Sequence, residues 1–180
     1  FPATLPAISG ANLTNLPAGG VGEYIGNSIA ISSNDTALAN DDVNRFITIS
    51  DGSTSNRVAL RIDSDNKIGG FVTDGTSQAS FRYEMNTLNF TRVAIKYKVN
   101  DFALWVNGFE VLTDFVGSTP SGLNVFDFKN ADNTNDFYGK TKEIGYYDTI
   151  LTDLELETLT SYKSWTSMVN ELNLNIIYNG

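Results

Sequence analysis

The stretch TRVAIKYKVNDFALWVNGFEVL (Thr91–Leu112) decides the fold class of this 180-residue chain. Its first part alternates between an apolar face, formed by Val93, Ile95, Tyr97 and Val99, and a charged face, formed by Arg92, Lys96 and Lys98. Alternation with a period of two predicts a strand with one buried and one solvated face.

Two turns fold the same stretch into three strands. Asn100-Asp101 turns the chain back into Phe102–Val106, and Asn107-Gly108 turns it again into Phe109–Leu112. Asn-Gly favours the positive φ angles of a tight hairpin. Consecutive short strands without long apolar helices between them predict an antiparallel sheet, not a parallel one.

Further short strands are predicted on both sides of this meander, at residues 46–50, 57–63, 68–73, 80–83, 123–128 and 143–147. In the second of these, Val58, Leu60 and Ile62 share one face, and Arg57 and Arg61 share the other. Thr152 and Glu155 form a capping box, which predicts a helix running to about Tyr162. The apolar spacing from Trp165 to Leu172 predicts a second short helix, and residues 174–178 are expected to add a last strand.

The composition predicts one folded domain with an extended lead. Residues 1–22 hold three of the four prolines without a strand or helix period, so we expect a linker or stalk segment there and the sandwich over residues 23–180. The length and the 41% apolar content suffice for one hydrophobic core.

The missing residue types and the charge exclude several function classes. The chain contains no Cys and no His, which excludes Cys- or His-based zinc sites, a Ser-His-Asp triad and a Cys nucleophile. The net charge of −9 argues against nucleic-acid partners and anionic membranes. No apolar run approaches the roughly 20 residues of a membrane span.

Two stretches resemble a known family. Asp101–Gly108 resembles a hairpin of laminin-G-like and pentraxin-like domains, and residues 142–156 resemble their last core strand and following helix. This resemblance covers roughly residues 23–162. It implies an all-β, concanavalin A-like jelly roll of two antiparallel sheets with short C-terminal helices, often carbohydrate-binding and sometimes calcium-dependent. Residues 9–18 also resemble stretches that precede the tip domains of phage tail fibres; a generic linker is the alternative.

The candidate ligand-binding residues come from one strand and one loop. Trp105 points away from Leu104 and Val106, so it either stacks on a sugar or, as the sequence favours, packs against a neighbouring segment. The loop offers amides, carboxylates and an aromatic ring for sugar hydroxyls, at Asn130, Asp132, Asn135, Asp136 and Tyr138. No cofactor is required by these residues. Calcium could use Asp132 and Asp136, or Asp41 and Asp42. The favoured interpretation is that these residues are ordinary loop acids exposed to solvent.

The expected function is binding without catalysis. Related sandwich glucanases carry Glu-x-Asp-x-x-Glu on one strand, and no such strand occurs here: the close pair Glu155 and Glu157 falls in the predicted helix. We expect a receptor-binding or adhesive domain of a phage tail fibre, on a virion or otherwise extracellular. Its expected partners are a cell-surface glycan or polysaccharide and other virion proteins, in a homotrimer. A structural virion protein and a bacterial surface lectin are the alternatives.

Overall fold

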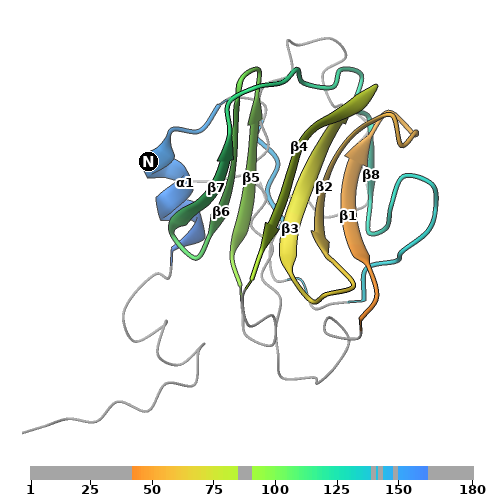
Figure 1. Ribbon diagram of the computed structural model, residues 1–180, viewed down its shortest axis with the longest axis horizontal. Coiled ribbons are helices and arrows are strands. Elements are labelled where there is room, and N and C mark those ends of the chain that lie inside the picture. Colours follow the sequence, from red (N-terminus) through yellow and green to blue (C-terminus); the bar gives the residue numbers. More distant parts are fainter. Residues whose placement is uncertain (1–41, 85–90, 139–140, 142–143, 148–149, 162–180) are drawn as a thin grey trace, which may run out of the picture.

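A computed structural model gives the structure and describes residues 42–84, 91–138, 141, 144–147 and 150–161. Two antiparallel sheets face each other as a β-sandwich, with one helix on the outer side of the smaller sheet (Figure 1). The expected lead segment, second helix and last strand lie outside the described residues. The elements are β1 (Arg45–Ser50), β2 (Asn56–Ile62), β3 (Ile68–Asp74), β4 (Thr76–Tyr83), β5 (Val93–Lys98), β6 (Asp101–Val106), β7 (Phe109–Asp114), β8 (Val125–Asp127) and α1 (Asp153–Thr160).

The larger sheet has five strands in the order β4-β3-β2-β1-β8. Its central register pairs Thr48 with Ala59 and Ala59 with Phe71. Because side chains alternate along a strand, this register places Val58, Leu60 and Ile62 toward the other sheet. Arg57, Ala59 and Arg61 therefore share the outer face, as the sequence predicts.

The smaller sheet is the meander β5-β6-β7 that the sequence predicts. Asn107 and Gly108, which join β6 to β7, have φ angles of 51° and 89°, the left-handed conformation expected of an Asn-Gly hairpin. Val99 departs from the prediction. The strand ends at Lys98, and Val99 is 49% exposed beside the turn, so it is not part of the buried face.

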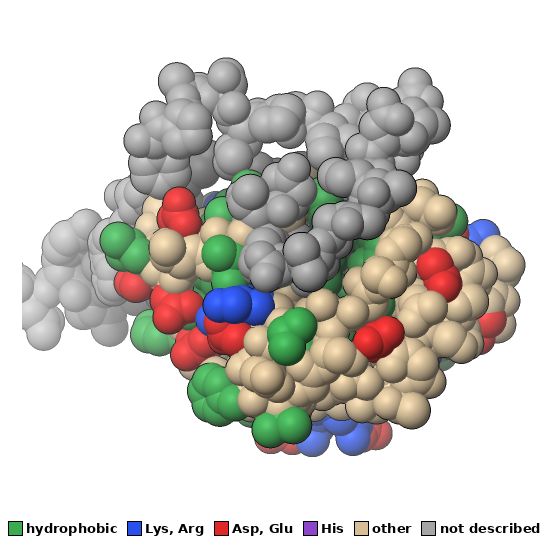
Figure 2. Space-filling model, turned by 90° about the horizontal axis from the view of Figure 1, so that it is seen from above, with side chains coloured by type: hydrophobic (Ala, Val, Ile, Leu, Met, Phe, Trp, Pro, Cys, Tyr) green, Lys and Arg blue, Asp and Glu red, His purple; other side chains and the backbone are tan. Residues whose placement is uncertain are grey.

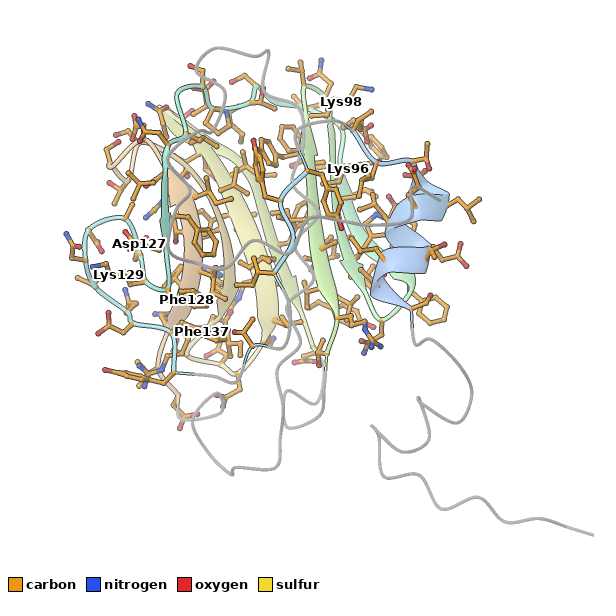
Figure 3. The ribbon with its side chains drawn as sticks, turned by 180° about the vertical axis from the view of Figure 1, so that it is seen from behind. Lys96, Lys98, Asp127, Phe128, Lys129 and Phe137 are labelled. Carbon is orange, nitrogen blue, oxygen red and sulfur yellow. The ribbon has the colours of Figure 1, made fainter. Side chains whose placement is uncertain are left out.

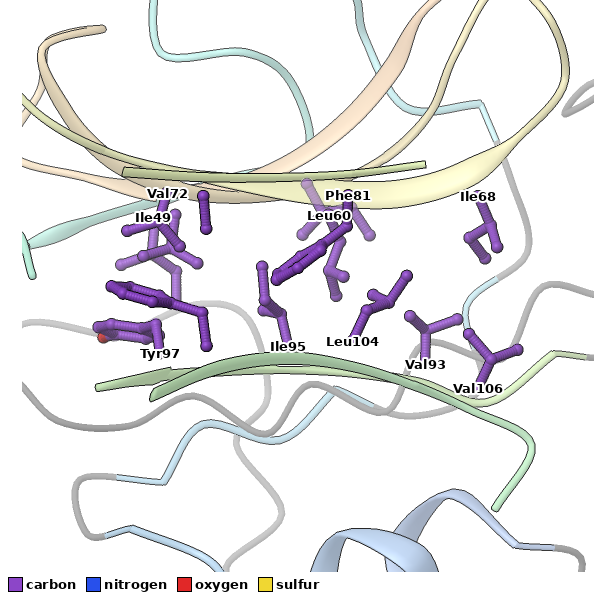
Figure 4. Packing of buried hydrophobic residues seen from close by; sticks show 14 of the residues in the cluster. Ile49, Leu60, Ile68, Val72, Phe81, Val93, Ile95, Tyr97, Leu104 and Val106 are labelled. Carbon is purple, nitrogen blue, oxygen red and sulfur yellow. The ribbon is translucent and has the colours of Figure 1, made fainter. Parts of the chain in front are cut away.

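The core lies between the two sheets and consists of aliphatic and aromatic side chains from both (Figure 4). Its fully buried members include Ile47, Ile95, Tyr97, Phe102 and Leu104. This layer of interdigitating side chains holds the sandwich together through apolar burial. Burial and the neighbouring Tyr146 together raise the pKa of Tyr97 far above its ordinary value, so this phenol stays neutral.

Helix α1 covers the outer face of the smaller sheet. Its N-terminal capping box is present: Thr152 Oγ1 accepts from the Glu155 backbone N–H, and the Glu155 carboxylate accepts from the Thr152 backbone N–H. Leu156 packs from the helix onto Ala94, Ala103 and Trp105.

The expectation that Lys96 is solvated is wrong. Lys96 does lie on the outer face, but α1 covers that face and leaves it 7% exposed. Its Nζ is 2.9 Å from Asp101 Oδ1 and 3.1 Å from Asp153 Oδ1. Burial disfavours the charge, yet these two partners outweigh it and raise the pKa of Lys96. Lys96 thus connects the helix N-terminus to the sheet.

One predicted strand is wrong in its described part. Residues 144–147 lie in no strand, although Ile144 and Tyr146 still pack against the core. Side-chain burial therefore explains the apolar pattern there without strand pairing. Within the described part of the chain, no helix is long and apolar enough to cross a membrane.

The β2–β3 turn gives a prediction for acid stability. Asp63 is buried, and its carboxylate accepts hydrogen bonds from Arg82 Nε at 2.6 Å and from the backbone N–H groups of Asp65 and Lys67. Burial alone would raise the pKa of Asp63, but these hydrogen bonds lower it below 3.8. The carboxylate therefore contributes stability above pH 3.8, and this contribution is lost as the pH falls through the lower folded value.

We expect Asp63→Asn to lower the free energy of unfolding at pH 7 by about 1–2 kcal/mol, a modest figure because Arg82 is half exposed. Urea titrations of both proteins from pH 7 to pH 2 check this prediction. The difference between them should shrink below pH 3.8. A difference that stays constant over the whole range would contradict this role of Asp63.

Candidate functional site

Two arginines flank one aromatic ring on the outer face of the five-stranded sheet. Arg57 and Arg61 lie on β2, and Phe71 lies on β3 opposite Ala59, midway between them. Their guanidinium carbons lie 4.5 Å and 5.5 Å from the centroid of the Phe71 ring. We call Arg57, Phe71 and Arg61 the arginine platform. The strand register and the cation–π contacts bring the two charges to one place.

An aromatic ring and a glycine lie beside the platform on the outer face. Phe46 packs edge-on against Phe71, with ring centroids 5.7 Å apart. Gly69 pairs with Arg61 across the β2–β3 ladder, and a Cβ atom there would lie 2.0 Å from the Phe81 carbonyl oxygen. Only glycine fits at this position, so no side chain stands on the sheet between Arg61 and Arg82.

The positive charge of the platform is incompletely compensated. Arg61 forms no hydrogen bond or ion pair with any described residue, and the Nε atoms of both platform arginines are buried without a described partner. Burial is the largest effect and lowers the pKa of each guanidinium, although the charge of Asp132 opposes this for Arg57 and that of Asp63 opposes it for Arg61. Neither arginine forms an ion pair with a described carboxylate, so an anion bound here would relieve part of the cost of burying the two charges.

The other arginine on this face is neutralised within the protein. Arg82, on β4, pairs with both Asp63 and Asp65. These hydrogen bonds raise the pKa of Arg82. The outer face therefore carries one arginine that is ion-paired within the protein, Arg82, and two that form no ion pair with a described residue, Arg57 and Arg61.

The loop after β8, residues 128–138, lies at the β8 edge of the five-stranded sheet (Figures 1 and 3), and its Asn130 reaches Arg57 of the platform. Backbone hydrogen bonds fasten it to the sheet: Phe137 N–H donates to the Phe128 carbonyl at 2.8 Å, and Phe46 N–H donates to the Asn135 carbonyl at 3.2 Å. Phe128 and Phe137 pack together at its base with ring centroids 6.3 Å apart. Figure 3 shows both rings beside the larger sheet, away from Lys96 and Lys98 on the smaller one.

Two predicted residues of this loop act on the platform. Asn130 is 7% exposed, and its Oδ1 accepts a hydrogen bond from Arg57 Nη1. Asp132 is exposed, and its negative charge raises the pKa of Arg57. The structure therefore brings Asn130 and Asp132 together with an arginine pair that the sequence did not single out.

The remaining loop candidates lie farther along the same loop. Asn135 has a positive φ of 55° at the turn, and the Asp136 carbonyl accepts from Arg45 Nη1 at 3.1 Å. Tyr138 is half exposed, with the Arg45 guanidinium carbon 4.5 Å from its ring centroid. Asn135 shapes the loop, and Asp136 and Tyr138 contact Arg45 of β1. The role of all three in ligand binding stays a prediction.

Trp105 lies on the other sheet, away from all the loop candidates. It is 6% exposed beneath α1, in a cluster with Ala94, Ala103 and Leu156. This is the packing role that the sequence favoured over sugar stacking. The helix covers the indole, which places Trp105 outside the candidate site.

The loop acids form no evident cation site. No group of three or more Asp or Glu residues suited to a metal ion occurs in the described ranges. Asp132 Oδ1 instead accepts hydrogen bonds from both the backbone N–H and the hydroxyl of Thr134, which lower the pKa of Asp132. Calcium binding through Asp132 and Asp136 stays a prediction; Asp42 accepts a hydrogen bond from Asn66, and Asp41 lies outside the described residues.

Charge is distributed unevenly over the surface. Figure 2 shows acidic side chains gathered around a basic one at one edge of the molecule, while much of that face is uncharged. Against a net charge of −9, four of the five arginines of the chain lie on β1, β2 and β4. Of these four, Arg57, Arg61 and Arg82 lie on the outer face of the five-stranded sheet, and Arg57 and Arg61 form no ion pair with a described carboxylate.

Comparisons with known proteins support the architecture. No protein family model and no curated protein matches the chain. Among solved structures, the CBM40 of the Ruminococcus gnavus IT-sialidase aligns with a TM-score of 0.59 at 16% identity, over 78% of this chain and 84% of that one. The same module bound to α2,3-sialyllactose aligns with a TM-score of 0.57 at 15% identity, over 76% and 84%.

A larger enzyme shares the fold in part. A leech intramolecular trans-sialidase aligns with a TM-score of 0.54 at 17% identity, over 81% of this chain but 24% of the enzyme. At these identities the likeness concerns the fold alone, and the laminin-G-like resemblance stays a prediction at the level of family. The chain is a two-sheet antiparallel β-sandwich of the kind seen in sialidase carbohydrate-binding modules.

Proposed function

We propose that this protein is a non-catalytic glycan-binding module that uses the outer face of its five-stranded sheet. The observation that carries the proposal is the arginine platform, in which two half-buried guanidinium groups flank Phe71 and neither forms an ion pair with a described carboxylate. Guanidinium groups bind carboxylates with strong, directional hydrogen bonds. The preferred ligand is therefore a glycan that carries a carboxylate.

The neighbouring structures suggest a specific first ligand. A module of the same fold is described as bound to α2,3-sialyllactose, a trisaccharide with one carboxylate. Lactose is its neutral counterpart. We use sialyllactose as the charged ligand and lactose as the neutral ligand, because they differ by the acidic sugar that the platform would recognise.

Isothermal titration of the purified protein with the two ligands tests this function, with a wider array of acidic and neutral glycans beside it. We expect the charged ligand, or another carboxylated glycan of the array, to bind with an affinity that falls as salt rises. Lactose should not bind measurably. Folded protein that binds no acidic glycan at low salt would refute the proposal. Repeating the titration with calcium and with a chelator tests the predicted calcium sites. Incubating the protein with the charged ligand and measuring released sugar tests for catalysis, and we expect no product.

We further propose that the module serves attachment to a host cell surface as part of a phage tail fibre, on the virion. This part rests on the sequence, through the phage-like stretch at residues 9–18 and the absence of cysteine. Binding of the protein to host envelopes and a trimer in light scattering of the full fibre are the expected results. A monomeric fibre would refute the trimer. A gene deletion that weakens particles but leaves adsorption intact would indicate the structural virion role instead.

A further inference from the structure

The hydrogen-bond partner of Arg57 is a neutral amide. Asn130 Oδ1 accepts from Arg57 Nη1, and Asn130 is almost fully buried beside the sheet. An amide oxygen can fix the direction of a guanidinium without cancelling its charge, whereas a carboxylate in the same place would do both. The residue type at position 130 therefore decides how much positive charge the platform keeps.

The loop backbone holds Asn130 firmly. Its N–H donates to the Thr134 carbonyl at 2.8 Å, and its carbonyl accepts from the Asn133 N–H at 3.0 Å. Asn133 adopts a positive φ of 64°, which closes this tight turn. Because both backbone groups of Asn130 are occupied, its side chain reaches Arg57 from a fixed starting point.

We propose that Asn130 is a positioning residue of the anionic-glycan site, and that its neutrality makes the site selective for acidic ligands. This inference rests on the proposed function. Asn130 orients Arg57 beside Phe71, so that Arg57 and Arg61 present their charge to one ligand carboxylate. Asp132 differs from Asn130 in that it is charged, exposed to solvent and hydrogen-bonded by Thr134, so solvent screens part of its charge from Arg57.

Three variants test this role by titration with the charged ligand. Asn130→Asp keeps an acceptor for Arg57 but adds a negative charge, so we expect about 10-fold weaker binding. Asn130→Ala removes the acceptor and keeps the charge of Arg57, so we expect a smaller loss of about 3-fold. The matched control is Asn100→Asp in the turn between β5 and β6, where Oδ1 accepts from the Gly117 backbone N–H. It has the same net charge as Asn130→Asp and should bind within about 2-fold of the wild type.

The outcomes separate this inference from the proposed function. If the wild type binds no acidic glycan, the proposed function itself fails. If the wild type binds and Asn130→Asp binds equally well, or if Asn130→Asp and Asn130→Ala lose the same affinity, the neutrality of Asn130 is irrelevant and this inference is overturned.

A fourth variant covers the case in which Asn130→Asp does not fold. Asp132→Asn keeps the acceptor for Thr134 and removes the one carboxylate whose charge acts on Arg57. We expect it to strengthen binding of the charged ligand about 2-fold. An unchanged or weaker affinity would overturn the inference.

Discussion

Replacing Arg61 with methionine is expected to weaken binding of the charged ligand about 100-fold while leaving the melting temperature unchanged or raised. The loss in affinity follows because a guanidinium forms two charge-assisted hydrogen bonds with a carboxylate, each worth about 1.5 kcal/mol or more. Little stability should be lost, because the described interactions of Arg61 are the contact with the Phe71 ring and a longer-range attraction to Asp63, and its Nε has no described hydrogen-bond partner. Methionine can keep the apolar contact with Phe71.

Arg82→Met is the matched control for this experiment. Arg82 lies on the same face, but it pairs with Asp63 and Asp65. Its replacement should therefore lower the melting temperature and change the affinity by less than about 3-fold. Titration and thermal unfolding of both variants check the pair. An Arg61→Met protein that melts well below the wild type but binds normally would show that Arg61 is structural.

Replacing Trp105 with alanine is expected to lower the free energy of unfolding by about 3–5 kcal/mol. The indole fills the space between β6 and α1, where it packs against Leu156, and alanine would leave a cavity there. Loss of this contact also weakens the attachment of α1, to which Lys96 contributes through Asp153. Chemical unfolding in urea measures this effect.

Trp105→Phe separates packing from ligand binding. Phenylalanine keeps most of the apolar contact, so we expect a smaller loss of stability, about 1–2 kcal/mol, and unchanged affinity for the charged ligand. The opposite pattern, in which Trp105→Ala keeps wild-type stability but loses binding, would return Trp105 to the site as a sugar-stacking residue.

Local patterns predicted most of the sandwich. The alternation of Val93, Ile95 and Tyr97 and the Asn107-Gly108 turn are short-range signals, and the meander is as they indicate. The capping box at Thr152 is equally local, and it begins α1 as expected. Each of these features depends on neighbours within a few residues, which is why one sequence suffices to see them.

The exposure of individual residues depended on contacts that are distant in sequence. Lys96 sits on the polar side of a regular alternation, and it is buried because a helix 57 residues later covers it. Val99 continues the apolar alternation, but the strand ends before it. Neither outcome can be predicted from the strand alone, because each is decided by what packs on the sheet or where the turn begins.

Part of the candidate site could be predicted from the sequence. The loop residues Asn130 and Asp132 could be chosen for their chemistry, and Arg57 and Arg61 could be placed on one face of a strand. Two arginines on one face of a strand usually indicate that this face is exposed to solvent. Their convergence required the β2–β3 register, which sets Phe71 between them. The available signal was the pairing of two arginines on one strand in a chain of net charge −9.

The most direct test of the central claim is to observe the arginine side chains during binding. The chain has five arginines, so the Nε–H region of its ¹H–¹⁵N spectrum is simple to assign with the Arg57 and Arg61 variants. We predict that the charged ligand shifts the signals of Arg57 and Arg61, that Arg82 and Arg92 stay in place, and that the neutral ligand shifts none of them. Binding of the charged ligand with unmoved signals of Arg57 and Arg61 would contradict the claim that the arginine platform is the binding site.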